Sequence, residues 1–90
     1  MMSSLPEGVL LRIANRFRSE LVLTCPVDTG RLRISINVTI KGNTIIVTMV
    51  DYAMFVEFGT FKQRPNPFIR NAINNKLGKI IQEEIQRYYG

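Results

Sequence analysis

Few residues in this chain could do covalent or metal chemistry. Its 90 residues include no histidine and a single cysteine, Cys25. A histidine general base, a cysteine–histidine nucleophilic pair, a zinc site and an internal disulfide are therefore excluded by composition. We expect Cys25 to be a small, semi-buried residue at a helix end, in a protein of a reducing compartment. We also expect no enzymatic activity, no cofactor and no bound metal.

The segment Asp28-Thr29-Gly30 is the one motif with a catalytic precedent. In an aspartic protease, two chains of this size would each supply one such carboxylate, and the two would share a proton. Arg31 and Arg33 would instead keep the Asp28 carboxylate ionised, and that class of fold is nearly all β. We therefore favour a structural turn over a catalytic site. The residues assigned to structural turns are Pro26, Asp28, Thr29, Gly30 and Gly59.

Glu57 is the carboxylate with the most unusual surroundings. It lies in the apolar run Phe55-Val56-Glu57-Phe58, where an unpaired charge would be costly to bury. Glu57 must therefore face water or meet an arginine. We predict an ion pair between Glu57 and Arg31 or Arg33.

The chain is basic, with 12 Lys and Arg against 7 Asp and Glu and a formal net charge of +5. This excess suits nucleic acid, an anionic membrane surface or an acidic protein as partner. The basic residues are dispersed, however, and neither a glycine-rich clamp nor a pair of strand aromatics is present for stacking bases. A small basic nucleic-acid-binding domain stays as an alternative function. Polar residues interrupt the N-terminal apolar stretch, so we expect no signal peptide and no membrane partner.

Two amphipathic helices are predicted, one at each end of the chain. The first begins at Ser4-Leu5-Pro6-Glu7, which fits a capping box, and runs to about Thr24. Its apolar residues recur at steps of three and four and predict a core-facing stripe of Val9, Leu10, Ile13, Ala14, Phe17 and Leu21. The second helix begins after Pro67 and reaches nearly to the C-terminus. Gly78 within it indicates a close approach or a bend.

An antiparallel hairpin is predicted between the helices. Residues 31–41 alternate between apolar and polar without a break, which is typical of a strand. Gly42-Asn43 fits a two-residue turn, and residues 44–50 form the returning strand. If Lys41 faces Thr44, the register of the whole ladder follows. The pairs are then Ile40 with Ile45, Thr39 with Ile46, Val38 with Val47, Asn37 with Thr48, Ile36 with Met49 and Ser35 with Val50.

Residues 51–68 hold five of the eight aromatic residues and fit neither the helical nor the strand period. We predict a short turn or an irregular third strand there. The elements together give one α+β domain over residues 1–90, with both helices on one face of a small antiparallel sheet. So small a core can hardly take every aromatic ring, and the surplus predicts a surface that a neighbouring subunit covers. The predicted subunit interface consists of Tyr52, Phe55, Phe58, Phe61 and Arg64.

Three sequence blocks carry a family resemblance. They are PVDTGRLRISI (residues 26–36), YAMFVEFGT (residues 52–60) and PNPFIRNAI (residues 65–73), in this order and at these distances. Together they closely resemble the gene-product-ten-like family of the HK-ninety-seven type tailed phages. Members of that family are small proteins of the neck, of the head-to-tail joint or of the tail end. The resemblance spans roughly half of the chain.

The resemblance implies assembly rather than catalysis. Such proteins are similar to tail terminators, which act as rings where head meets tail, so we expect a homo-oligomer, hexameric or alternatively dodecameric. A ring needs two different surfaces on each subunit, because a heterologous contact repeated by rotation closes into a cycle. The implied partners are a head-closure or connector protein, the tail-tube protein, and DNA that passes through the channel without sequence-specific binding. The implied location is the virion, after assembly in the host cytoplasm.

Overall fold

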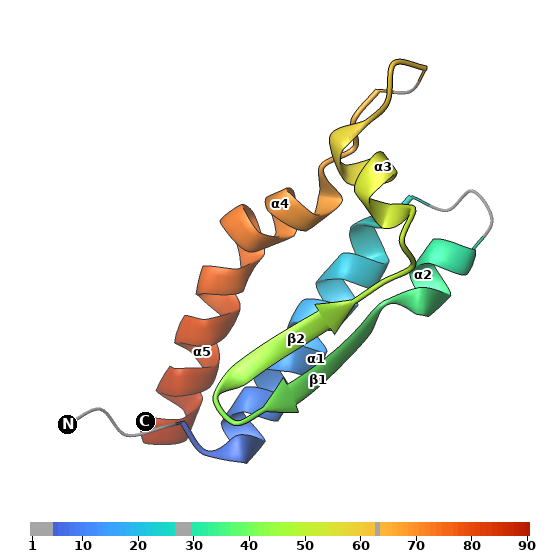
Figure 1. Ribbon diagram of the computed structural model, residues 1–90. Helices are drawn as coiled ribbons and strands as arrows, with labels where there is room; N and C mark the ends of the chain where they lie inside the picture. Colours follow the sequence, from blue (N-terminus) through green and yellow to red (C-terminus); the bar gives the residue numbers. More distant parts are fainter. Residues whose placement is uncertain (1–4, 27–29, 63) are drawn as a thin grey trace.

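The computed structural model describes residues 5–26, 30–62 and 64–90. Along the chain the elements are α1 (Glu7–Thr24), α2 (Arg31–Ser35), β1 (Asn37–Lys41), β2 (Thr44–Thr48), α3 (Ala53–Phe58), α4 (Phe68–Ala72), the π-helical turn η1 (Ile73–Leu77) and α5 (Gly78–Tyr89). The long helix α1 lies behind the β1–β2 hairpin, and the continuous helical stretch from α4 to α5 runs beside both (Figure 1). The predicted α+β fold class is confirmed.

Helix α1 forms where the apolar pattern predicts it. All six residues of the predicted stripe are buried. The helix ends at Thr24, and Cys25 has extended backbone angles directly ahead of Pro26, because a residue before proline is disfavoured in the helical region. The predicted capping box depends on Ser4, which lies outside the described residues.

The hairpin has the predicted register over five pairs, from Lys41 with Thr44 to Asn37 with Thr48. Its turn uses Gly42 at a φ of 61°, a conformation that glycine adopts without strain. The two outermost predicted pairs lie beyond this ladder. One of them has a different contact, in which the Val50 N–H donates to Ser35 Oγ at 3.1 Å.

The prediction of a strand over residues 31–35 is wrong, since these residues form α2. Leu32 and Ile36 are 4% and 1% exposed, whereas Ile34 is 81% exposed. A spacing of four residues places two side chains on one side of a helix, while a strand would also turn Ile34 inward. Gly30 precedes α2 at a φ of 76°, in the left-handed region. Residues 31–35 therefore form a helix, because burial of Leu32 and Ile36 at helical spacing outweighs the alternating pattern that favours a strand.

The prediction of a turn or irregular strand over residues 51–68 is wrong for Ala53–Phe58, which form helix α3. Ala53 and Glu57, four residues apart, are the buried side of this helix. Gly59 follows at φ 78° and ψ 175°, which is open to glycine and strained for other residues. The chain then projects beyond the end of α3 around residues 59–62 (Figure 1).

Two apolar clusters form the core along α1. The larger joins α1 to α2, α3 and α4 and consists of Phe17, Leu21, Cys25, Leu32, Ile36, Ala53, Phe68 and Ala72. The smaller joins Val9 and Ile13 of α1 to Ile80 of α5, with Ile45 of β2 packed against them. A Cβ at Gly78 would meet only open space, so the predicted close approach at Gly78 is wrong. The π-helical turn η1 ends directly before this glycine.

The molecule is elongated, with extents of 48 × 23 × 22 Å and a radius of gyration of 14.6 Å. A compact chain of this length would have a radius of gyration near ~12 Å. The core is therefore a narrow strip along α1, and a large share of the side chains lies at the surface.

Candidate functional site

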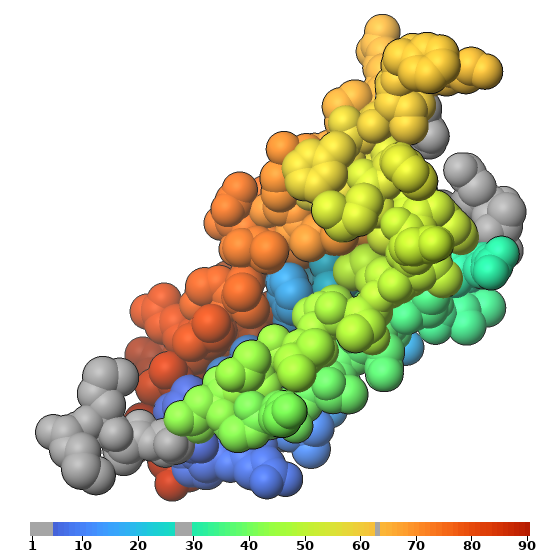
Figure 2. Space-filling view, viewed as in Figure 1, coloured from blue at the N-terminus to red at the C-terminus, as the bar shows by residue number. Residues whose placement is uncertain are grey.

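The three phenylalanines predicted for the interface are exposed. Phe55 and Phe58 on α3 are 61% and 56% exposed, and Phe61 just beyond α3 is 96% exposed. Together with Met54, at 55%, we call them the aromatic patch. The segment that carries them is yellow in Figure 2 and stands out from one end of the molecule. Grouped apolar side chains of this size are typical of interaction surfaces.

The other two residues predicted for the interface lie differently. Tyr52 is half-buried and packs against the larger core cluster. Arg64 is exposed and lies on the same loop as Phe61. Arg64 thus closely follows the aromatic patch along the chain, whereas the Tyr52 ring packs against the core.

Glu57 fixes the base of the loop that carries Phe61. Its Oε1 accepts a hydrogen bond from the Ile69 N–H at 2.8 Å, and its Oε2 accepts one from the Arg70 N–H at 2.9 Å. These N–H groups belong to the first turn of α4, where a helix has no internal acceptors to offer. Arg70 Nε donates to Oε2 at 2.8 Å, and Arg70 Nη2 donates to the Glu57 carbonyl at 3.0 Å. The buried carboxylate is thus bonded on both oxygens and joins α3 to α4.

The predicted partners of Glu57 are therefore corrected, since Arg70 takes the place assigned to Arg31 or Arg33. The first turn of α4 offers two backbone donors and a guanidinium together, which is more than either predicted arginine could supply. Arg70 also lies over the Phe58 ring, with its Cζ 4.9 Å from the ring centroid. Glu57, Arg70 and Phe58 form what we call the loop clamp.

Arg33 has a different neighbour, Cys25. Burial raises the pKa of the Cys25 thiol, and the charge of Arg33 offsets part of that rise. Cys25 is 3% exposed, so it is a buried core residue rather than the semi-buried one expected. A buried and protonated thiol is a poor nucleophile.

A hollow of about 250 Å³ opens beside α3. It lies between the end of β2, α3 and the first turn of α4. Its lining is apolar except for Asp51, and consists of Val47, Met49, Val50, Asp51, Ala53, Met54 and Ile69. We call it the α3 hollow. Sequence analysis missed it because its walls come from three elements that are separated along the chain.

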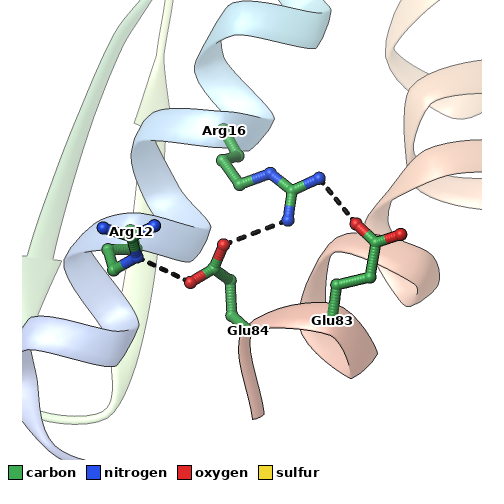
Figure 3. Close-up of polar contacts among 4 residues, drawn as sticks. All are labelled: Arg12, Arg16, Glu83 and Glu84. Carbon is green, nitrogen blue, oxygen red and sulfur yellow. Dashed lines mark hydrogen bonds and ion pairs between the residues drawn. The ribbon is translucent and has the colours of Figure 1, made fainter. Parts of the chain in front are cut away.

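A second polar cluster ties α1 to α5, as Figure 3 shows. Arg12 Nε lies 2.7 Å from Glu84 Oε1, and Arg16 Nη1 lies 3.0 Å from Glu84 Oε2. Arg16 Nη2 also contacts Glu83 Oε1 at 2.7 Å. Sequence analysis missed this cluster, although Glu84 lies four residues after the buried Ile80 and hence on the same helix side.

The arginines control the ionisation of Glu84, which is 4% exposed. The hydrogen bond from Arg12 lowers the pKa of Glu84, burial acts in the opposite direction, and the bond from Arg16 lowers the pKa further. The bonds to Glu83 and Glu84 in turn raise the pKa of Arg16. The cluster is therefore charged at neutral pH and holds the two long helices together.

Several basic residues are thus used inside the fold. Arg12, Arg16 and Arg70 are in ion pairs, and Arg18 Nε donates to the Ile36 carbonyl at 3.1 Å.

No group of three or more Cys, Asp or Glu side chains that could hold a metal occurs in residues 5–26, 30–62 and 64–90. Over the same ranges, no helix has both the length and the apolar character that crossing a bilayer requires.

The residues assigned to structural turns are only partly described. Gly30 and Gly59 both have positive φ, at 76° and 78°, and each sits at an end of a short helix. Pro26 follows the last residue of α1 by two positions. Asp28 and Thr29 lie outside the described residues, so the structure leaves their role as a prediction.

One comparison with known proteins finds a match. A family model described as "Bacteriophage HK97-gp10, putative tail-component" matches residues 6–59. This stretch runs from the residue before α1 to Gly59 at the end of α3, which is more than half of the 90 residues. Neither a curated protein nor a solved structure matches the chain. The chain belongs to the HK97-gp10-like family of bacteriophage tail components.

Proposed function

We propose that this tail-related structural protein assembles as a ring at the junction of head and tail in a tailed phage or prophage. The ring completes or terminates the tail and joins it to the head. Family membership supports the connection with the tail. The observation that carries the proposal of assembly is the exposure of Phe55, Phe58 and Phe61 together at one end of the molecule.

The total surface of the chain supports a partner as well. Its accessible area is 6571 Å². A folded monomer of this mass exposes about 5,400 Å² on average, so the chain exposes roughly a fifth more than expected. The excess, about 1,200 Å², is larger than the ~800 Å² that one partner contributes to a standard interface. Subunit contacts would cover it.

The proposed role is mechanical. A ring of six subunits, or of twelve beside a portal, would stop growth of the tail tube and present a docking surface to the head-closure or connector protein. It would surround the channel through which DNA passes without sequence-specific binding. No bond is made or broken in this role, which agrees with the absence of histidine and with the buried Cys25.

The test is the mass of the purified protein across a range of concentrations, by light scattering and sedimentation velocity, followed by electron microscopy of the largest species. We expect a concentration-dependent oligomer with a central opening. A strict monomer that binds duplex DNA with a steep salt dependence would contradict the proposal and favour the nucleic-acid-binding alternative.

Two substitutions separate assembly from folding. Phe58→Ser and Phe61→Ser should weaken assembly more than they lower the melting temperature, because both rings are mostly exposed in the single chain. Phe61→Ser is the cleaner probe, since the Phe58 ring also contacts Arg70 in the loop clamp. Equal losses of assembly and stability would mean that these rings belong to the core of the subunit.

A further inference from the structure

We infer that subunits join by inserting Phe61 of one copy into the α3 hollow of the next. This inference rests on the proposed assembly and names the contact that performs it. The anchor, Phe61, is not among the residues that line the α3 hollow, so insertion of one copy into the next is a heterologous contact that can repeat around a ring.

The Phe61 tip has the properties of an anchor. Its side chain is 96% exposed, and it lies beyond the end of α3 on a projecting segment (Figure 1). The base of that segment is held by the loop clamp and by a hydrogen bond from the Asn66 N–H to the Val56 carbonyl at 2.8 Å. A loop whose base is already fixed loses less freedom on binding than a free one. Aromatic anchors that fill a pocket on the partner are common binding hot spots.

The α3 hollow has the properties of a receptor for one ring. Its lining is apolar apart from Asp51, and its volume of about 250 Å³ lies below the range of sites for drug-sized ligands. It also lacks the convergent polar groups that orient a small molecule. Phe61 of the same chain leaves it empty, because that ring is almost fully exposed.

The charges around the α3 hollow and around Phe61 favour a second copy of the chain as the occupant of the hollow. Asp51 is exposed at the α3 hollow and forms no ion pair within the described part of the chain. The Phe61 tip is flanked by cations, since Lys62 follows it directly and Arg64 is exposed on the same loop. Insertion of Phe61 would bring these cations toward Asp51 of the neighbour. Such complementarity favours the correct partner and its orientation.

The experiment uses two variants of the full chain, each of which removes one half of the contact. Phe61→Ser removes the anchor. Met54→Lys places a cation in the α3 hollow, at a residue that is 55% exposed and so can change without disturbing the core. Ile34→Ser is the matched control, because Ile34 is 81% exposed on α2, outside both halves of the contact. Circular dichroism checks folding, and sedimentation velocity measures assembly.

We expect each of the two variants alone to associate at least about tenfold more weakly than wild type, as is typical when an aromatic hot spot is lost. An equimolar mixture of the two should form dimers and stop there, because only one intact contact can form between them. Ile34→Ser should assemble like wild type. If Met54→Lys fails to fold, Asp51→Lys at the exposed edge of the hollow replaces it.

Three results would overturn the inference. If both variants alone form the wild-type oligomer, subunits join through another surface, while the proposed ring stands. If Phe61→Ser assembles normally but no longer binds the tail-tube protein, the anchor serves that partner instead. If wild type stays monomeric at every concentration, the inference and the proposed function fail together.

Discussion

Glu57 is a buried carboxylate whose hydrogen bonds all lead to the start of α4. In Glu57→Gln, an amide NH₂ replaces one carboxylate oxygen. The NH₂ group is a hydrogen-bond donor, so it cannot accept the hydrogen bonds that this oxygen accepts at the start of α4. We expect the free energy of unfolding to fall by about 1–3 kcal/mol, measured by urea denaturation. Glu20→Gln, on a side chain without an ion pair among the described residues, should change it by less than about 0.5 kcal/mol. Equal effects of the two would contradict this role for Glu57.

The corrected partner of Glu57 can be tested by a double-mutant cycle. Glu57→Gln and Arg70→Gln should be coupled by about 0.5–3 kcal/mol, because the two side chains share a hydrogen bond, from Arg70 Nε to Glu57 Oε2 at 2.8 Å. Glu57→Gln and Arg33→Ala should be additive within about 0.5 kcal/mol. Coupling to Arg33 instead of Arg70 would restore the pairing predicted from the sequence.

Glu84 makes the stability depend on pH. Arg12 and Arg16 lower its pKa below the ordinary 4.5, so the folded chain binds this proton more weakly than the unfolded chain. The resulting stabilisation is fully present above pH 4.5 and is lost as the pH falls through the lowered pKa. Glu84→Gln lacks it. Melting temperatures of wild type and Glu84→Gln should therefore differ most at neutral pH and converge as the pH falls below 4.5; a constant difference would contradict this account.

At the scale of elements, the sequence correctly predicts the helices and strands for which the spacing of apolar residues allows one interpretation. The stripe of α1 is correct because its helical pattern is long, and five pairs of the hairpin are correct because the two-residue turn fixes their register. Residues 31–35 fit both periods, since Leu32, Ile34 and Ile36 alternate while Leu32 and Ile36 also lie four apart. Only packing on the core decides between them, and it exposes Ile34. Helix α3 was missed because its short apolar side contains Glu57, whose burial depends on α4.

The two glycines at the ends of α3 and η1 should respond oppositely to alanine. Gly59 has φ 78° and ψ 175°, so Gly59→Ala is strained and should lower the free energy of unfolding by about 1–3 kcal/mol. Gly78 has helical angles and open space at its Cβ, so Gly78→Ala should raise it by about 0.5–1 kcal/mol. Thermal and urea unfolding of both variants measure this. A loss of stability in Gly78→Ala would show that the space is occupied.

At the scale of the whole molecule, the aromatic patch could be anticipated and the α3 hollow could not. The number of aromatic residues in a 90-residue chain already indicates that some rings must stay outside the core. A hollow has no such signature, because β2, α3 and α4 must first be placed side by side in space. The same holds for the contact of Arg12 and Arg16 with α5, which removes two cations from any surface offered to nucleic acid.

Charge reversal tests whether the Phe61 loop of one copy meets the α3 hollow of the next. Asp51→Lys and Arg64→Glu should each weaken association, because each places like charges opposite one another across the subunit contact. The double variant restores an opposite-charge pair and should associate more tightly than either single variant. Lys79→Glu on α5 changes the net charge as Arg64→Glu does and should leave association within about twofold of wild type, since surface charges beyond about 10 Å are screened at 0.1 M salt. Sedimentation equilibrium at 0.1 M salt measures all four. A Lys79→Glu effect as large as that of Arg64→Glu would mean that net charge governs association rather than contact between Arg64 and Asp51.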